Sequence, residues 1–183
     1  SNIPNLVYLA PTTYEEYIAM LDWSTEQREH PVAIRVPGAV IHGEKPTKDY
    51  GILNKYETVQ KGSGAAIIAL GTFFGMGKQA AELIEKKTGV KPTLINPVYI
   101  TGIDEELLES LKKDHKAVVT LEDGILDGGF GEKIARFYGD SDMRTVNFGL
   151  KKEFLDRYDA NEVLRQNGIT PEQIADRAAE LIK

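Results

Sequence analysis

Residues Ala65-Ala66-Ile67-Ile68-Ala69-Leu70 form an unbroken apolar run that ends at Gly71. Strands of a parallel sheet are covered on both faces, so they are apolar at nearly every position instead of at every second one. A second, largely apolar run occupies residues 117–121 and ends at the polar sequence Glu122-Asp123-Gly124. The two runs predict buried strands of one parallel sheet.

Outward from these runs, the chain alternates short β-branched or apolar segments with helical patterns. Further strands are predicted at 6–10, 32–34, 93–95 and 145–148, and an antiparallel edge strand is expected within 52–59. Helices are predicted to follow the capping residues Thr13, Asp104 and Thr170, and to run from Lys78 to Gly89. This order predicts an α/β fold with three α/β/α layers around a mostly parallel sheet.

The composition narrows the possible functions. The 183 residues carry a net charge of −6, with 42% hydrophobic and 27% charged residues, which is ordinary globular usage. No apolar run approaches the roughly 18–20 residues that cross a bilayer, and no Lys/Arg block is present, which argues against a membrane or nucleic-acid partner. Without cysteine there is no disulfide or thiolate nucleophile, and we expect a cytoplasmic setting.

The carboxyl ends of the strands are where ligands gather in open α/β sheets. Glu122 and Asp123 end one strand, and adjacent carboxylates there suit either Mg²⁺ binding or an acid–base pair. The more conservative interpretation, which we favour, is that the two side chains point to opposite faces and separately cap a turn or pair with a cation.

A glycine cluster, Gly128-Gly129-Phe130-Gly131, opens a predicted helix. Free N–H groups there would suit an anion, but close packing, where a Cβ would clash, is the favoured interpretation. Gly71, Gly75 and Gly77 are interpreted as a turn, since their spacing fits no phosphate-binding motif. The three histidines, His30, His42 and His115, share no metal-ligand spacing, so no metal site is expected.

Several segments, in order, resemble thiamine-diphosphate enzymes of the transketolase superfamily, and most of all the 1-deoxy-D-xylulose-5-phosphate synthase family. The segments with this resemblance are residues 3–11, 31–38, 70–72, 95–97 with 103–105, 120–131 and 147–150. The resemblance implies that residues 1–50 are the end of a pyrimidine-binding domain plus a linker, which we expect to span about 38–49. Residues 51–183 would then be a transketolase-like C-terminal domain.

By the same resemblance, the full-length protein would be a dimeric transferase of three domains that binds thiamine diphosphate and Mg²⁺ between the first two, with the end of the second domain in residues 1–50. The Gly-Asp-Gly…Asn motif and the activating glutamate of the family are absent here, so no catalytic residue and no bound cofactor are expected in this chain. The chain begins Ser1-Asn2 without Met, and we expect the natural protein to begin elsewhere. Residues 1–37 are expected to pack poorly because their own sheet is truncated.

Two departures from the family concern the substrate. The synthases end the strand with Arg-Tyr-Pro-Arg-Gly, whereas here only Arg35 matches, as a tentative substrate-binding residue. Either the native substrate differs, or a basic residue elsewhere, such as Lys45 or Lys48, compensates for the missing arginine. The family pattern Asn-Pro-Arg-Phe is Asn96-Pro97-Val98-Tyr99 here. The alternatives are another transketolase-like enzyme, or a non-catalytic assembly module like the C-terminal domain of a 2-oxo acid dehydrogenase β subunit. A flavodoxin-like binder of small molecules is a third, without a ligand motif to support it.

Overall fold

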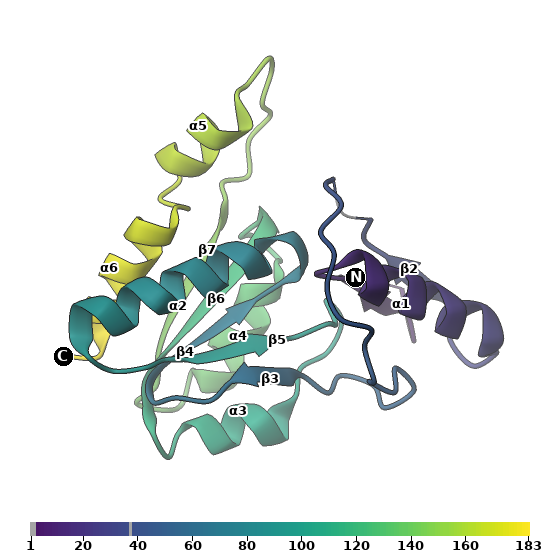
Figure 1. Cartoon of the computed structure of the whole chain (residues 1–183), viewed down its shortest axis with the longest axis horizontal. Coiled ribbons are helices and arrows are strands. Elements are labelled where there is room, and N and C mark those ends of the chain that lie inside the picture. The colour runs from purple at the N-terminus through teal and green to yellow at the C-terminus, as the bar shows by residue number, and fades with distance from the viewer. Residues whose placement is uncertain (1–2, 37) are drawn as a thin grey trace.

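A five-stranded sheet is the centre of the computed structural model, which describes residues 3–36 and 38–183 (Figure 1). Its strands are β3 (Glu57–Gln60), β4 (Gly64–Ala69), β5 (Thr93–Asn96), β6 (His115–Ile125) and β7 (Arg144–Leu150), in the spatial order β3-β5-β4-β6-β7. The last four strands are parallel to one another, and β3 lies antiparallel to β5 at the edge. The predicted mostly parallel sheet with an antiparallel edge strand is confirmed.

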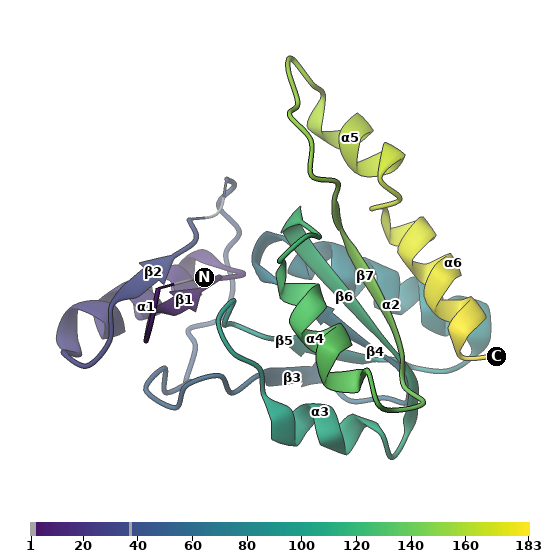
Figure 2. The same ribbon diagram turned by 180° about the vertical axis from the view of Figure 1, so that it is seen from behind.

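Helices cover both faces of this sheet (Figure 2). Helices α2 (Phe74–Thr88) and α6 (Pro171–Leu181) pack on one face, whereas α3 (Glu105–Leu111) and α4 (Phe130–Tyr138) pack on the other. Successive side chains of a strand point to opposite faces, so Ile67 joins the core under α2 and α6 while Ile68 joins the core under α3 and α4. The consecutive apolar residues 66–69 of β4 therefore fill two cores, and the three-layer architecture is confirmed.

The predicted helix signals are found where the sequence places them, with one exception. Thr13, Asp104 and Thr170 each accept a hydrogen bond from the N–H three residues later, and α2 ends at Gly89 with φ of 72°. The predicted turn over residues 71–77 is wrong: a 3-10 turn at Gly71–Phe73 leads directly into α2 at Phe74. Gly77 lies inside the helix, where a Cβ would come within 2.6 Å of Ala69 Cβ, so this glycine permits close helix–strand packing.

The N-terminal residues form a separate unit. Strands β1 (Val7–Leu9) and β2 (Val32–Ile34) are parallel, and the helix α1 (Tyr14–Glu26) connects them. Strand β2 is half-buried and belongs to no larger sheet, in line with the truncated sheet expected from the sequence. Pro37, which closes the predicted strand segment, lies outside the described residues.

The expectation that residues 1–37 pack poorly is wrong for β1 and for the inner face of α1. Leu9 and Met20 are fully buried against Val98 and Tyr99 of the C-terminal part. The backbone explains this contact, because Ala10 N–H donates to Val98 O at 2.8 Å and Ile100 N–H donates to Tyr8 O at 2.7 Å. The segment after β5 thus pairs with β1 on the side away from β2.

The predicted linker, residues 38–49, has no helix or strand and runs beside the start of α1. Tyr14 N–H donates to Ile41 O at 2.8 Å, and Gly43 N–H donates to a Glu15 carboxylate oxygen at 2.8 Å. At the other end of the chain, a protruding arm of residues 151–159 leads to α5 (Ala160–Gln166), which the sequence did not predict (Figure 1). No helix among the described residues is long and apolar enough to span a bilayer.

Candidate functional site at the carboxyl edge of the sheet

An ion pair connects the N-terminal unit to the carboxyl edge of the main sheet. Arg35, just after β2, places its Nη2 atom 3.1 Å from Oδ2 of Asp123 and also donates to the Asp123 backbone carbonyl. Thr72, in the turn after β4, donates to the same Asp123 Oδ2 at 3.3 Å. Arg35 and Thr72, from two different chain segments, therefore converge on Asp123, and the Arg35 side chain remains 35% exposed.

Glu122, the neighbour of Asp123, contacts the first turn of α4 and not Arg35. Its buried carboxylate accepts hydrogen bonds from Phe130 N–H at 2.8 Å and from Gly131 N–H at 2.9 Å. The N-cap residue Gly129 has no side chain to cap α4, so Glu122 satisfies N–H groups that the first turn of a helix leaves without partners. Burial raises the pKa of the Glu122 carboxyl, and the two N–H donors oppose this shift.

The tempting interpretation of Glu122 and Asp123 as a joint metal or acid–base pair finds no support in this geometry. One carboxylate caps a helix and the other pairs with Arg35, as in the conservative interpretation of these residues. Across residues 3–36 and 38–183, no group of three or more His, Asp or Glu side chains could hold a metal ion.

The glycine cluster at the start of α4 lies close against β6 and β7. A Cβ on Gly129 would lie 2.5 Å from Glu122 Oε2, and one on Gly131 would lie 2.5 Å from Thr120 Oγ1. Gly128 has φ of 71°, a conformation that favours glycine. The N–H groups that an anion would need, those of Phe130 and Gly131, donate to Glu122, so the structure favours close packing over an anion site.

A second polar contact between the two units is formed by Glu16. Its carboxylate accepts hydrogen bonds from Thr12 N–H at 2.6 Å, from Thr12 Oγ1 at 2.8 Å and from Asn96 Nδ2 at 2.9 Å. Burial raises the pKa of Glu16, and the Thr12 donors lower it. The sequence suggested only the capping box that begins at Thr13, and the glutamate instead turns toward Thr12 and the end of β5.

The turn after β5 contains backbone strain. Val98 has φ of 62°, rare for a β-branched residue, and Tyr99 N–H donates to Pro97 O at 2.5 Å across it, as in a γ-turn. Asn96 Oδ1 accepts from Val98 N–H at 3.1 Å and holds this conformation. Strain of this kind gathers at functional sites, and no sequence signal marked it.

The basic residues considered as replacements for the missing arginine do not join Arg35. Lys48 donates to the carbonyl of Lys55 at 2.5 Å and lies 5.8 Å from the centroid of the Tyr99 ring. Lys45 is exposed in the linker and makes no hydrogen bond or ion pair among the described residues.

The histidines are structural or peripheral. His115 Nδ1 donates to Leu111 O at 3.0 Å, and its Nε2 lies 2.8 Å from Thr93 Oγ1. Burial lowers the pKa of His115, which keeps the ring neutral. His42 pairs with Glu15 at the surface, 2.9 Å apart, and His30 lies near Glu29, so the three rings do not meet in one site.

Comparison with known proteins shows the family to which this chain belongs. The family described as "Transketolase, C-terminal domain" matches residues 54–174. The 1-deoxy-D-xylulose-5-phosphate synthase of Clostridium tetani is 31% identical over 185 residues, which cover 100% of this chain and 29% of that enzyme. The synthase of Clostridium perfringens strain SM101 is 32% identical over 188 residues, covering 100% of this chain and 30% of that enzyme.

Solved structures agree on the fold. A structure described as a split-gene transketolase, an inactive β4 tetramer, has a TM-score of 0.80 at 22% identity and covers 100% of this chain and 60% of that one. A Pichia stipitis transketolase in complex with sedoheptulose 7-phosphate has a TM-score of 0.67 at 19% identity, covering 99% of this chain and 26% of that one. This chain thus spans less than a third of the curated relatives named above, and it belongs to the transketolase C-terminal domain family.

Proposed function

We propose that this chain is the C-terminal part of a thiamine-diphosphate-dependent transferase of the 1-deoxy-D-xylulose-5-phosphate synthase type. Such an enzyme condenses pyruvate with glyceraldehyde 3-phosphate at the start of an isoprenoid precursor pathway. Within it, residues 1–50 complete a pyrimidine-binding domain and residues 51–183 form the C-terminal domain. The part described here supports assembly and does not perform catalysis on its own.

The observation that carries this proposal is the extent of the similarity. It runs through the whole chain, the N-terminal unit included, at about the same identity in independent relatives. A free-standing C-terminal module would have no use for β1, α1 and β2. The Arg35–Asp123 and Glu16–Asn96 contacts fasten that unit to the main sheet, as expected for the junction of two domains.

The cofactor, in this proposal, is bound by upstream domains. Thiamine diphosphate with Mg²⁺ supplies a carbanion for carbon–carbon bond formation when it is bound. The residues described here do not fit such a site, because Glu122 is occupied by two backbone N–H groups and Asp123 by Arg35. In this proposal, therefore, this chain supplies no group to the cofactor's chemistry.

Arg35 is the one residue that we propose for substrate binding in the complete enzyme. Asp123 engages its Nη2 atom, and the rest of the partly exposed guanidinium group remains available to an anionic substrate. The family's arginine after Pro97 is Val98 here, and that side chain is buried. Among the described residues, Arg35 is thus the arginine at this edge that matches the family. Either the acceptor differs from the phosphorylated aldehyde of the relatives, or a basic residue elsewhere in the complete enzyme takes the place of the missing arginine.

Calorimetry and complementation test the proposal. Titration of thiamine diphosphate with Mg²⁺ into this chain should give no saturable heat, whereas the chain combined with its upstream domains should bind and show transferase activity. Arg35→Gln in that complete enzyme should raise the KM for the acceptor. Micromolar cofactor binding by this chain alone would contradict the proposed division of roles. We also propose that the complete enzyme is cytoplasmic and forms a homodimer. Sedimentation analysis would test the homodimer.

A purely structural assembly module is the second candidate, and the arm at residues 151–159 favours it. Phe154 on this arm is fully exposed, and Tyr158 is 59% exposed. Helix α5, which follows, buries none of its residues. If the arm docks onto upstream domains of the same enzyme, Phe154→Ser should weaken co-purification with them. If complementation restores no activity while co-purification persists, the assembly function stands and the enzymatic one fails.

A further inference from the structure

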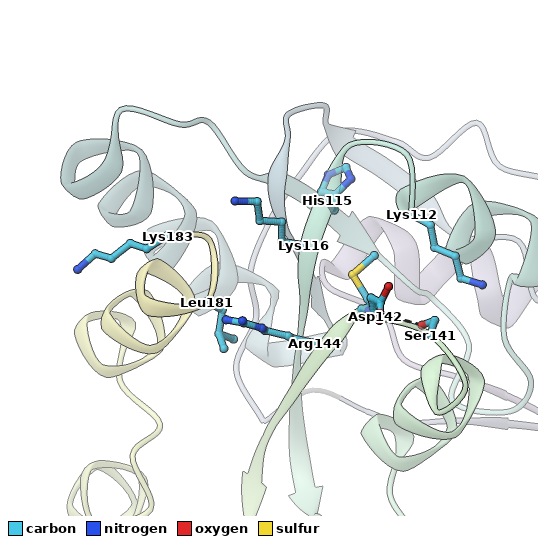
Figure 3. A pocket seen from close by; sticks show the side chains of 9 residues that line it. Lys112, His115, Lys116, Ser141, Asp142, Arg144, Leu181 and Lys183 are labelled. Carbon is cyan, nitrogen blue, oxygen red and sulfur yellow. Dashed lines mark hydrogen bonds between the residues drawn. The ribbon is translucent and has the colours of Figure 1, made fainter.

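A basic hollow lies at the amino ends of β6 and β7, at the edge of the sheet opposite the Arg35–Asp123 pair. Its volume is about 640 Å³, within the range of roughly 300–1,000 Å³ that is usual for small-molecule sites. Lys116 and Arg144 extend from adjacent strands toward α6, where Leu181 and Lys183 complete the lining (Figure 3).

The charges in this hollow are not balanced. The side chains of Arg144 and Lys183 form no ion pair or hydrogen bond among the described residues, and the Lys116 side chain has only a 3.4 Å hydrogen bond to Ile182 O. Lys112 also lines the hollow, but Glu109 neutralises it at 2.6 Å. Of the lining residues only Asp142 is acidic, so positive charge is in excess on a chain whose net charge is −6.

The remaining lining decides what kind of anion would fit. His115 uses both ring nitrogens internally, on Leu111 O and Thr93 Oγ1, so it presents no further polar atom to a ligand. Leu181 and Met143 supply apolar surface beside the cations. A small anion with an organic group would use both surfaces, because a guanidinium group binds phosphate oxygens in pairs and the apolar wall removes the organic group from water.

We propose that this hollow is a binding site for phosphate monoesters. Arg144 and Lys116 contact the phosphate, and Leu181 and Met143 contact the organic part. The C-terminus of a helix attracts cations, which explains why Lys116 contacts Ile182 O at the end of α6. The same attraction does not explain the position of Arg144, which lies at the start of β7 and whose side chain has no partner among the described residues.

A titration of the isotope-labelled chain followed by nuclear magnetic resonance tests this site. Phenyl phosphate and inorganic phosphate are the probes, at constant ionic strength so that screening does not change. Saturable amide shifts are expected at residues 115–116, 143–144 and 181–183, with tighter binding of phenyl phosphate. Arg144→Gln should weaken binding by about tenfold or more, as loss of a charge-assisted hydrogen bond implies.

Arg28→Gln is the matched control, because Arg28 is also exposed and unpaired but lies in the N-terminal unit. It should leave the affinity unchanged. Lys116→Gln provides a second variant at the site, should Arg144→Gln fail to fold. Non-saturating shifts, shifts confined to residues near Arg35, or equal affinity in wild type and both site variants would each overturn the proposal. Equal affinity for the two probes would overturn the contact with the apolar wall.

Discussion

Glu122 caps the helix that begins at Phe130: Glu122 Oε2 accepts a hydrogen bond from Phe130 N–H at 2.8 Å, although the glutamate belongs to β6. The cap of α4 is thus supplied by a neighbouring strand and not by the residue that precedes the helix, Gly129, which has no side chain to offer. This arrangement places a buried carboxylate beside the carboxyl edge of the sheet and ties α4 to β6.

The first prediction follows from this cap. Glu122→Ala leaves two buried N–H groups without an acceptor and should reduce the free energy of unfolding by about 1–3 kcal/mol. Glu122→Gln keeps one acceptor oxygen and should lose less. Urea denaturation measures both, and Glu153→Ala, at an exposed position without a side-chain partner, should be near neutral. Equal stability of Glu122→Ala and the control would contradict the capping role.

The second prediction concerns the space at Gly129. Its φ of −75° suits any residue, so a substitution there adds no backbone strain and acts through its contacts with Glu122 and Ile125. Gly129→Val would press against Glu122 and the Ile125 carbonyl, and overpacking should lower stability by about 1–3 kcal/mol. Gly75→Ala in α2 is the control, since a Cβ there meets nothing within 4 Å and should stabilise slightly. Thermal melts that rank the two variants in the opposite order would refute the packing interpretation.

The third prediction concerns the Arg35–Asp123 pair. The two side chains are 35% and 42% exposed, and solvent screens such a pair. Their coupling in a double-mutant cycle with Arg35→Gln and Asp123→Asn should therefore be at most about 1 kcal/mol. Sodium chloride at 1 M should remove most of it through screening. A coupling that stays large at high salt would show that the pair is structural and not an adjustable contact at a site.

The fourth prediction uses the single tryptophan as a reporter of the N-terminal unit. Trp23 packs beside Tyr50 in the core shared by both units. Glu16→Ala removes the carboxylate that accepts hydrogen bonds from Asn96 and from two donors of Thr12. The N-terminal unit should therefore unfold at a lower urea concentration than the rest of the chain. Urea unfolding followed by Trp23 fluorescence should then precede unfolding followed by circular dichroism. Coincident transitions in this variant would mean that the contact does not hold the units together.

The fifth prediction concerns pH. Because burial lowers the pKa of His115 below its unfolded value of 6.5, the unfolded state binds its proton first as the pH falls. The stability contributed by neutral His115 is present above pH 6.5 and is lost as the pH falls toward the folded pKa. Glu16 and Glu122, whose pKa values are raised, change stability in the opposite sense. The loss is therefore measured as the difference in the free energy of unfolding between wild type and His115→Gln over this pH range. A difference that does not change with pH would exclude this linkage.

Local signals in the sequence were enough to predict the sheet strands and three helix starts. The apolar run of β4 and the side-chain caps at Thr13, Asp104 and Thr170 act within a few residues, so the same interactions appear in the sequence and in the structure. The antiparallel edge strand and the three layers follow from that order of elements. The start of α2 was predicted wrongly because Gly77 is there for contact with Ala69, which a local pattern does not reveal.

Only the tertiary structure decided which side chains meet at the carboxyl edge. Arg35 and Asp123 are 88 residues apart, so the sequence offered each as a candidate without its partner. Glu16 and Asn96 are 80 residues apart, and the sequence did not single out their contact. The same holds for Glu122, a possible metal ligand by residue type that becomes a helix cap once α4 packs beside β6. A carboxylate's role depends on which donors surround it, and those donors come from chain segments that only folding brings together.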